Sequence, residues 1–311
     1  MFRRLLPLLI PLTLAACGNG GEPFGDFNAV AMLDTQTIVV GGGEGAIFTS
    51  SNGGATFFGQ DSGTTRQINA IKFLGPDLLG AAGDGGTFLN GSSGGSVWVE
   101  QDTANSDDLN DFQFVDSQFG IAVGNRSVIL RTFNGGLDWI GSFLPAQVDL
   151  QAVAFADLQT GWVGGGLGSI YKSVDGGQAW SLRSTGTQSM IFDIWLIDAQ
   201  RIWAVGAAGA VLFSGDGGDT WGPHGPGSVP NDLHRIFFQP DGLTGILLGN
   251  QYLARTFDGG DTWENLTPNL PAPLVDYADM AVVGDVVVVV GEDETILRSD
   301  DFGSSFSVLS L

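Results

Sequence analysis

Cysteine, basic residues and glutamate are scarce in this chain. Cys17 is the only cysteine among the 311 residues, so no disulfide can form within the chain. Twelve Lys and Arg residues face 34 acidic ones, and the formal net charge of −22 excludes nonspecific binding to nucleic acid or to anionic lipid headgroups. Only 6 of the 34 acidic residues are Glu. Because Asp favours turns over helix surfaces, this composition predicts an all-β, turn-rich protein.

The N-terminus predicts export and lipid anchoring. Arg3 and Arg4 precede an apolar stretch from Leu5 to Leu14, which is typical of a secretory signal and short for a transmembrane helix. The following Ala15, Ala16 and Cys17 resemble the lipobox of bacterial lipoproteins, although an ordinary signal with a chance cysteine is the alternative. We therefore expect a signal peptide over 1–16, a tether lipidated at Cys17 over 17–25, and one folded domain over 26–311. The expected location is the outer membrane, facing the periplasm.

An eight-residue motif that ends in an aromatic residue occurs seven times. Its copies are SSNGGATF (50–57), GSSGGSVW (91–98), TFNGGLDW (132–139), SVDGGQAW (173–180), SGDGGDTW (214–221), TFDGGDTW (256–263) and SDDFGSSF (299–306). The final aromatic residues are spaced by 41, 41, 41, 41, 42 and 43 residues. A period just above 40 with short strand-like segments predicts a seven-bladed β-propeller with one four-stranded blade per repeat. We call each copy an Asp box.

Each position of the Asp box has a structural reason. The Gly three residues before the aromatic is predicted to adopt a positive φ in a tight hairpin, as in Gly218. The acid or amide two residues earlier, as in Asp216, can accept hydrogen bonds from turn amides. The final Trp or Phe fills the gap between hairpin and sheet. The boxes are thus predicted to stabilise the fold, and no binding residue is placed in them.

The repeats divide the chain into blades that are contiguous in sequence. In the fourth blade the predicted strands are 150–156, 161–166, 169–174 and 178–184, with turn residues between them. The first blade begins near Phe27 and the seventh ends at residues 304–311. We therefore expect the ring to close by packing between the last and first blades, without strand exchange between the termini.

Two stretches carry a resemblance to a known family. GWVGGGLGSIYKSVDGGQAW (161–180) and IWAVGAAGAVLFSGDGGDTW (202–221) resemble the photosystem II stability/assembly factors, a family of seven-bladed propellers that are lipoproteins in cyanobacteria. The resemblance runs from about Phe24 to Leu311. It implies the thylakoid lumen as the location if the source is cyanobacterial. It implies a non-catalytic scaffold that binds subunits of a membrane protein complex and assists its assembly or stability. It also implies a basic, Arg-lined patch for these partners, to which no residue of this chain is assigned.

The charges suggest a second kind of partner surface. Turns between second and third strands, together with the connections between blades, are expected on one face of the ring. Several acidic residues on neighbouring blades lie in these segments. They are expected opposite Arg126, Arg183 and Tyr252. We call this group the acidic crescent, and its members are Glu44, Asp84, Asp107, Asp108, Glu292, Asp293 and Glu294. Its hypothetical role is to dock a basic segment of a partner protein, and the alternative is a solvated surface that keeps the protein soluble.

An enzyme is the rival class, because Asp boxes also occur in sialidases and some glycosidases. These need two positioned carboxylates, or a Tyr nucleophile beside an Arg cluster. Only Tyr252 among three tyrosines falls on the expected face, so no catalytic residue is assigned. His224 and His234 share one Pro- and Gly-rich connection, but two His without a third ligand do not define a metal site. No metal or cofactor is therefore predicted. The remaining alternatives are a glycan-binding or sialidase-like propeller and an accessory subunit of an envelope transporter.

Overall fold

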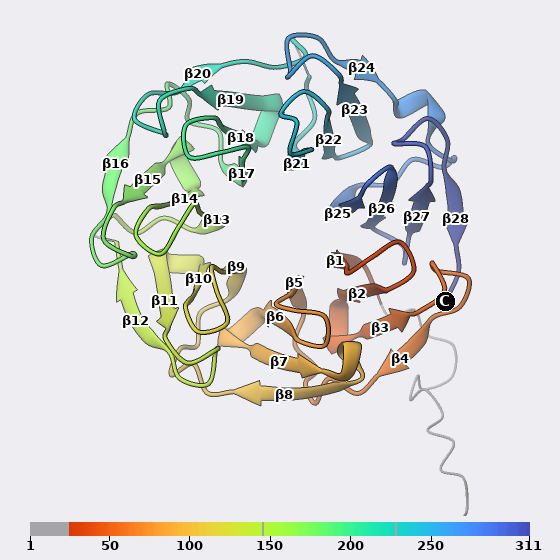
Figure 1. Ribbon diagram of the computed structural model, residues 1–311, viewed down its shortest axis with the longest axis horizontal. Helices are drawn as coiled ribbons and strands as arrows, with labels where there is room; N and C mark the ends of the chain where they lie inside the picture. Colours follow the sequence, from red (N-terminus) through yellow and green to blue (C-terminus); the bar gives the residue numbers. More distant parts are fainter. Residues whose placement is uncertain (1–24, 145, 228) are drawn as a thin grey trace, which may run out of the picture.

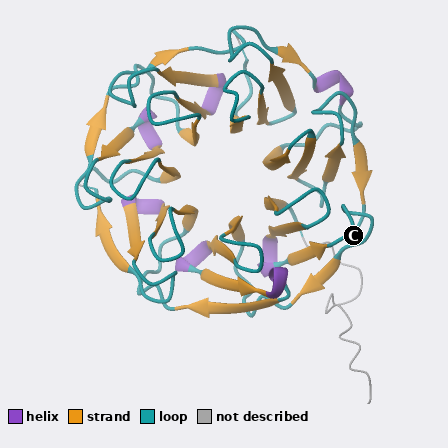
Figure 2. Cartoon of the chain, viewed as in Figure 1, coloured by secondary structure: helices purple, strands orange, loops and turns teal. Residues whose placement is uncertain are grey.

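The chain forms a ring of seven four-stranded antiparallel sheets around a central axis (Figure 1). The computed structural model describes residues 25–144, 146–227 and 229–311. In Figure 2 the strands of each blade follow one another from the axis to the rim of the ring, with short helices between some of them. The fold class predicted from the repeats is confirmed. No helix among the described residues is long and apolar enough to cross a membrane.

Each blade uses four strands that follow one another in the chain. Blades one to four comprise β1 (Phe27–Met32), β2 (Ile38–Gly42), β3 (Ile47–Ser50), β4 (Phe58–Gln60); β5 (Ile68–Phe73), β6 (Leu79–Gly83), β7 (Phe88–Ser92), β8 (Val97–Gln101); β9 (Leu109–Phe114), β10 (Gly120–Gly124), β11 (Val128–Thr132), β12 (Ile140–Phe143); and β13 (Leu150–Phe155), β14 (Gly161–Gly165), β15 (Ile170–Ser173), β16 (Ser181–Arg183). Blades five to seven comprise β17 (Ile191–Leu196), β18 (Ile202–Gly206), β19 (Ala210–Ser214), β20 (Gly222–Pro223); β21 (Leu233–Phe238), β22 (Gly245–Gly249), β23 (Tyr252–Thr256), β24 (Glu264–Asn265); and β25 (Tyr277–Val283), β26 (Val286–Gly291), β27 (Ile296–Ser299), β28 (Ser307–Leu309).

Short 3-10 helices mark several turns. Their bounds are η1 (Gly43–Gly45), η2 (Asp84–Gly86), η3 (Ser93–Gly95), η4 (Asn125–Ser127), η5 (Gly166–Gly168), η6 (Ala207–Gly209) and η7 (Thr267–Asn269). Five of them, η1, η2, η4, η5 and η6, join the second strand of a blade to its third. The second residue of these five turns has a positive φ, for example 54° at Glu44.

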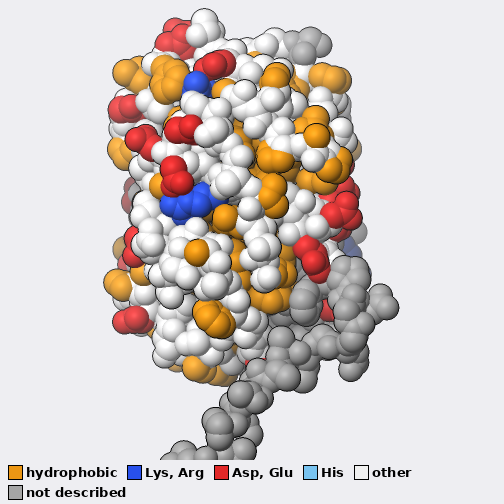
Figure 3. Space-filling view, turned by 90° about the vertical axis from the view of Figure 1, so that its right-hand side faces the viewer, with side chains coloured by type: hydrophobic (Ala, Val, Ile, Leu, Met, Phe, Trp, Pro, Cys, Tyr) orange, Lys and Arg blue, Asp and Glu red, His pale blue; other side chains and the backbone are white. Residues whose placement is uncertain are grey.

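The core lies between neighbouring blades. Second strands such as β14 are buried along their whole length, because each sheet is covered on both faces by its neighbours. The outermost strands are half solvated, and Phe58 of β4 is 62% exposed. The side of the ring in Figure 3 carries more acidic than basic side chains, with apolar ones exposed between them.

The Asp boxes have the predicted geometry. In blade five, Gly218 has φ +78° and its amide donates to Oγ of Ser214 (2.8 Å). The Thr220 amide donates to Oδ1 of Asp216 (2.9 Å), and Nε1 of Trp221 donates to the Gly218 carbonyl (3.2 Å). Hydrogen bonds from the Thr220 hydroxyl and amide hold the pKa of Asp216 far below its ordinary value. The box is therefore a closed hydrogen-bonded hairpin.

Ring closure joins β1 to β25 and β26 by side-chain packing and polar contacts. One apolar cluster combines Phe27 and Val40 of the first blade with Val288 of the seventh. The Val30 amide donates to Oδ2 of Asp279 (2.8 Å). Since every sheet is built from consecutive strands, the expected closure without strand exchange is confirmed.

Candidate functional site

The central axis holds a cavity of about 730 Å³ walled by the innermost strands of the blades. Its lining also includes Asp157, Asp198 and Ala199, which lie in turns after the innermost strands β13 and β17. The cavity therefore reaches the end of the ring that carries the turns between first and second strands. Turns between second and third strands lie at the other end.

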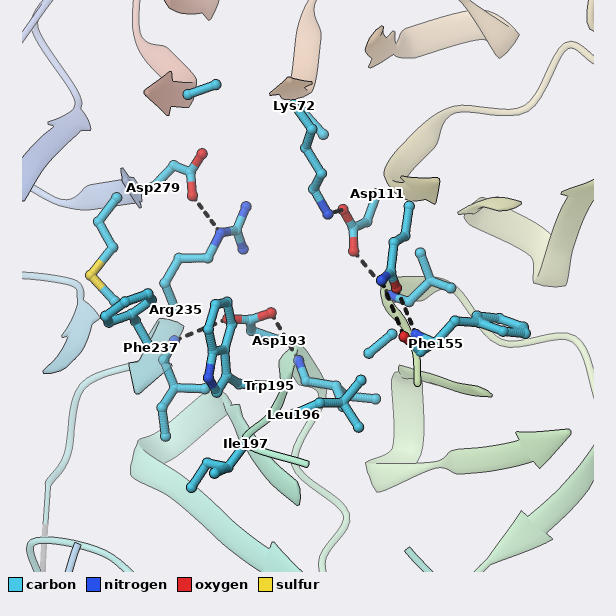
Figure 4. Close-up of a pocket in the computed structure, with 18 of the residues that line it drawn as sticks. Lys72, Asp111, Phe155, Asp193, Trp195, Leu196, Ile197, Arg235, Phe237 and Asp279 are labelled. Carbon is cyan, nitrogen blue, oxygen red and sulfur yellow. Dashed lines mark hydrogen bonds and ion pairs between the residues drawn. The ribbon is translucent and has the colours of Figure 1, made fainter. Parts of the chain in front are cut away.

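Ion pairs and inter-blade hydrogen bonds form a charged layer in this cavity (Figure 4). Nζ of Lys72 lies 2.5 Å from Oδ1 of Asp111, and Nε of Arg235 lies 2.6 Å from Oδ1 of Asp279. Asp193 accepts the amides of Ile194 (2.8 Å) and Ile236 (3.0 Å) on its two oxygens. The layer thus contains three carboxylates and two cations.

Each of the three carboxylates also bonds the innermost strand of the next blade. Asp111 accepts the Val153 amide (3.0 Å), as Asp193 and Asp279 accept those of Ile236 and Val30. A carboxylate in this position supplies an acceptor for an amide that has no ladder partner on that side. The charged layer therefore holds neighbouring blades together.

Burial raises the pKa of Asp193 to about 6, against the opposing effect of the Arg235 charge and the Ile236 amide. The Asp193 carboxyl group is therefore protonated at a higher pH than is ordinary for a carboxyl group. A carboxyl tuned in this way is typical of a general acid in hydrolases. Each of its oxygens also accepts a hydrogen bond from a backbone amide, which ties the carboxyl group to its own strand and to the next blade.

Apolar side chains line the part of the wall formed by blades five to seven. Trp195 and Phe237 pack with ring centroids 4.9 Å apart, and Leu196, Ile197 and Met280 line the same cavity. Blades two and three face them with the polar side chains of Lys72, Asp111 and Gln113 (Figure 4). The wall of the cavity therefore combines an apolar patch with charged groups, and blades five to seven carry Asp193, Arg235 and Asp279 beside that patch.

Sequence reasoning missed this site, although a signal for it exists. Every innermost strand has a register shift after its first residue, and the third residue follows that shift. The third residue is Ala in blades one, two and four. In the other four blades it is charged: Asp111, Asp193, Arg235 and Asp279. Alignment of the innermost strands would have revealed this replacement of alanine by charge.

The acidic crescent lies at the other end of the ring from the cavity turns. Asp107 forms an ion pair with Arg126, which therefore lies beside the crescent and not opposite it as the sequence suggested. Asp108 accepts the Gly85 amide (2.8 Å) and Nδ2 of Asn125 (2.9 Å) on its two oxygens. These two carboxylates thus have partners within the ring.

The other crescent residues contact their own turns or the adjacent blade. Asp84 accepts Nδ2 of Asn69 (2.9 Å), and Glu292 accepts the Asp276 amide (3.2 Å). Glu44, Asp293 and Glu294 each occupy a turn with positive φ, and the Asp293 amide donates to Asp26 (3.1 Å).

Two residues expected on the crescent face have separate environments. Arg183 lies in the outer strand β16, with its Nε 3.3 Å from Oδ1 of Asp219, and Tyr252 begins β23. Cys17 lies outside the described residues.

The two histidines have separate partners. His224 packs edge-to-face against Trp203, with ring centroids 5.2 Å apart, whereas Nε2 of His234 lies 2.7 Å from Oδ1 of Asn250. Burial lowers the pKa of His234 below its ordinary value. Within the described ranges no group of three or more His, Cys, Asp or Glu side chains is arranged to hold a metal ion.

The fold and its boxes define an Asp-box β-propeller with seven blades. Residues 90–181 match the model of the family described as photosynthesis system II assembly factor YCF48, which confirms the resemblance predicted from the sequence. No curated protein sequence matches the chain.

Solved structures of similar fold include two structures of YCF48 and one of a xyloglucanase. YCF48 bound to a D1 peptide is 16% identical with a TM-score of 0.71, and the match covers 89% of this chain and 92% of that one. YCF48 from Cyanidioschyzon merolae gives the same identity, TM-score and coverage of this chain, and 96% of its own chain is covered. The GH74 xyloglucanase from Xanthomonas campestris is 13% identical with a TM-score of 0.75 over 91% of this chain, but only 53% of the enzyme chain is covered.

Proposed function

We propose that this protein is a non-catalytic scaffold that binds a polypeptide segment of a membrane protein in its central cavity. The observation that carries the proposal is the amphipathic wall of the cavity. Trp195 and Phe237 offer a partly exposed apolar surface, and the charged layer and the polar side chains of blades two and three lie beside and opposite it. A segment with one apolar and one polar edge complements this wall, and aromatic side chains in a cavity are typical binding hot spots.

The carboxylates of the cavity support a binding role over hydrolysis. Asp111, Asp193 and Asp279 all bond backbone amides of the next blade, and Asp157 and Asp198 bond the amides of their own turns. A glycosidase needs carboxylates that are free to act as acid, base or nucleophile. The raised pKa of Asp193 and the xyloglucanase likeness favour a glycosidase as the second candidate. We expect no hydrolysis of a panel of aryl glycosides, and turnover that is lost in Asp193→Asn would favour the enzyme.

The class of partner is inferred from the comparisons. The structure of YCF48 with a D1 peptide has a propeller of the same fold in complex with a segment of another protein. We infer that this chain likewise assists the assembly or stability of a membrane protein complex. The photosystem itself is one candidate, and a complex of the bacterial envelope, including a transporter, is the other.

Membrane attachment is a second part of the proposal. Leu14, Ala15, Ala16 and Cys17 support cleavage and lipidation at Cys17, and a diacylated anchor would hold the ring near its client. We propose an exported protein at the outer membrane, facing the periplasm, or in the thylakoid lumen. Metabolic labelling with an alkyne fatty acid tests this, because Cys17→Ser should abolish the label.

The acidic crescent remains a proposed second contact for a basic partner segment. The exposed turn residues Glu44, Glu292 and Asp293 support it. The crescent lies at the end of the ring away from the turns that the cavity reaches. One experiment can therefore distinguish binding at the crescent from binding in the cavity.

Site-specific photocrosslinking in cells tests the cavity. A photoreactive phenylalanine analogue replaces Phe237 in one variant and Glu44 in a second, and crosslinked peptides are identified by mass spectrometry. We expect the probe at 237 to capture a defined segment of a membrane protein. Capture by the probe at 44 alone would move the partner site to the crescent, and capture by neither would reject the scaffold function.

A further inference from the structure

A second hollow lies on the outside of the ring, between blades five and six. It has a volume of about 430 Å³ and is lined by Pro226, Val229, Pro230, Asn231, Gln251, Tyr252, Trp263, Asn265 and Thr267. We call it the blade 5–6 groove. Its volume lies within the range of about 300–1,000 Å³ that is typical of small-molecule sites.

Two departures from the repeat build this groove. Blade five ends in a two-residue outer strand, β20, and a Pro- and Gly-rich segment follows it in the sequence before β21 begins at Leu233. Blade six also ends in a two-residue outer strand, β24, followed by η7. Proline cannot donate to a ladder, and Pro226 and Pro230 line the groove. These are the segments near β20 and β24 in Figure 1.

The groove has no charged side chain in its lining, although 34 of the 311 residues are acidic. Its polar groups are one hydroxyl-bearing tyrosine, one threonine and three amides. Burial raises the pKa of Tyr252, so its hydroxyl stays neutral. An uncharged lining in such an acidic protein indicates a neutral ligand.

Several of these polar groups keep free hydrogen-bonding capacity. Asn231 uses its Nδ2 on the Asn250 carbonyl (2.7 Å), and Asn265 uses its Oδ1 on the Thr267 amide (2.9 Å). Gln251 uses its Nε2 on Asp276 (3.1 Å). The side-chain oxygens of Asn231 and Gln251 can therefore still accept hydrogen bonds, and Nδ2 of Asn265 can still donate. The Tyr252 hydroxyl is available for both. Both donors and acceptors are available, which matches a ligand rich in hydroxyl groups.

The aromatic side chains supply flat apolar surface beside these amides. Nε1 of Trp263 is bonded to the Gly260 carbonyl (3.0 Å), and its ring packs against Trp203 and Phe238. Its indole is thus fixed and offers stacking without a free donor. Tyr252 packs against the same cluster of buried residues. Aromatic rings held in place lose little conformational entropy on binding.

We propose that the blade 5–6 groove binds a neutral oligosaccharide. The aromatic surfaces stack on the apolar faces of sugar rings, while the amides and the Tyr252 hydroxyl bond the sugar hydroxyls. This site is separate from the central cavity and does not depend on the scaffold function.

Calorimetric titration of the full chain with cellotetraose, chitotetraose and maltotetraose tests the proposal. We expect at least one of them to bind, with tetragalacturonate weaker because the protein carries a net charge of −22. Tyr252→Phe removes only the hydroxyl, and Asn265→Ala only the amide. Loss of one hydrogen bond weakens binding about fivefold in each variant. The control Phe58→Ala removes an exposed aromatic residue of blade one and should leave the affinity unchanged.

Three results would overturn the proposal. Absence of binding to all three sugars at millimolar concentrations would reject the ligand class. Equal affinity of the wild type, Tyr252→Phe and Asn265→Ala would place any sugar elsewhere on the ring. Binding of a proline-rich decapeptide to the groove without any sugar binding would assign it to polypeptides. A circular dichroism spectrum equal to that of the wild type confirms that each variant is folded.

Discussion

Removal of the Asp279 carboxylate is expected to weaken ring closure more than any surface ion pair does. Asp279 accepts the Val30 amide (2.8 Å) of the first blade and the Arg235 guanidinium (2.6 Å) of the sixth. It therefore joins three blades at the point where the two ends of the domain meet. In Asp279→Ala, the Val30 amide and Arg235 both lose this partner.

The magnitude follows from these two contacts. A hydrogen bond to a charged acceptor contributes about 1.5–3 kcal/mol to the free energy of unfolding. Breaking a buried ion pair costs about 3–5 kcal/mol, but the Arg235 side chain is 26% exposed and regains part of this from water. We therefore expect Asp279→Ala to lose about 3–4 kcal/mol of stability. Asp279→Asn keeps an acceptor for Val30 and should lose about half of that.

Guanidinium unfolding followed by tryptophan fluorescence measures this loss, with eight tryptophans as probes. The matched control is Asp300→Ala, because Asp300 pairs with Arg298 (2.6 Å) but its side chain is 69% exposed. The free energy of unfolding of this control should decrease by about 1 kcal/mol or less. Equal unfolding midpoints for Asp279→Ala and Asp300→Ala would refute the argument that this carboxylate closes the ring.

Three further predictions concern single residues. Since the pKa of Asp193 is raised to about 6, protonation favours the folded state, and this stabilisation is lost as the pH rises through 6. The difference in melting temperature between the wild type and Asp193→Asn should therefore decrease as the pH is raised from 4 to 7. A difference that stays constant over this range would contradict the prediction. A hydrogen bond from the Thr262 hydroxyl lowers the pKa of Asp258 to about 2, so its contribution is present above about pH 4 and lost as the pH falls through 2. The melting temperatures of the wild type and Asp258→Asn should converge in acid. A methyl group on Gly218 would lie 2.2 Å from Nε1 of the buried Trp162, so Gly218→Ala should lose about 2–4 kcal/mol in chemical unfolding, whereas Gly222→Ala, with no atom within 4 Å, should be neutral.

The fold was predictable because every blade repeats the same local solution. The Gly and the aromatic of the box recur at fixed offsets in all seven copies, and the acid or amide recurs in every copy except the second, which has Ser93 there. Each of these residues satisfies a requirement of one hairpin. Gly54, at the start of the series, has φ +88° and Gly303, at its end, has φ +84°. The consecutive order of the strands also followed from the repeats, and with it the mode of ring closure.

The central cavity was not predictable in the same way. Its residues are the positions where the repeat is broken, such as Asp193 and Arg235, and a search for what the blades share passes over them. Which side chains meet across the axis depends on the register shift at the start of each innermost strand. Arg126 shows the same limit, because the sequence placed it in the correct turn but not beside Asp107. Contacts between blades depend on the angle of each sheet, which no local pattern encodes.

The most direct test of the scaffold function is the affinity of the full chain for the segment captured by the probe at residue 237. Calorimetry with that synthetic peptide compares the wild type, Trp195→Ala, and a variant in which Glu292, Asp293 and Glu294 are reversed to Lys. The account predicts that Trp195→Ala binds at least about tenfold more weakly, as loss of an aromatic anchor typically does, while charge reversal has little effect. Full affinity of Trp195→Ala, with binding lost in the charge-reversed variant, would contradict the central cavity as the partner site.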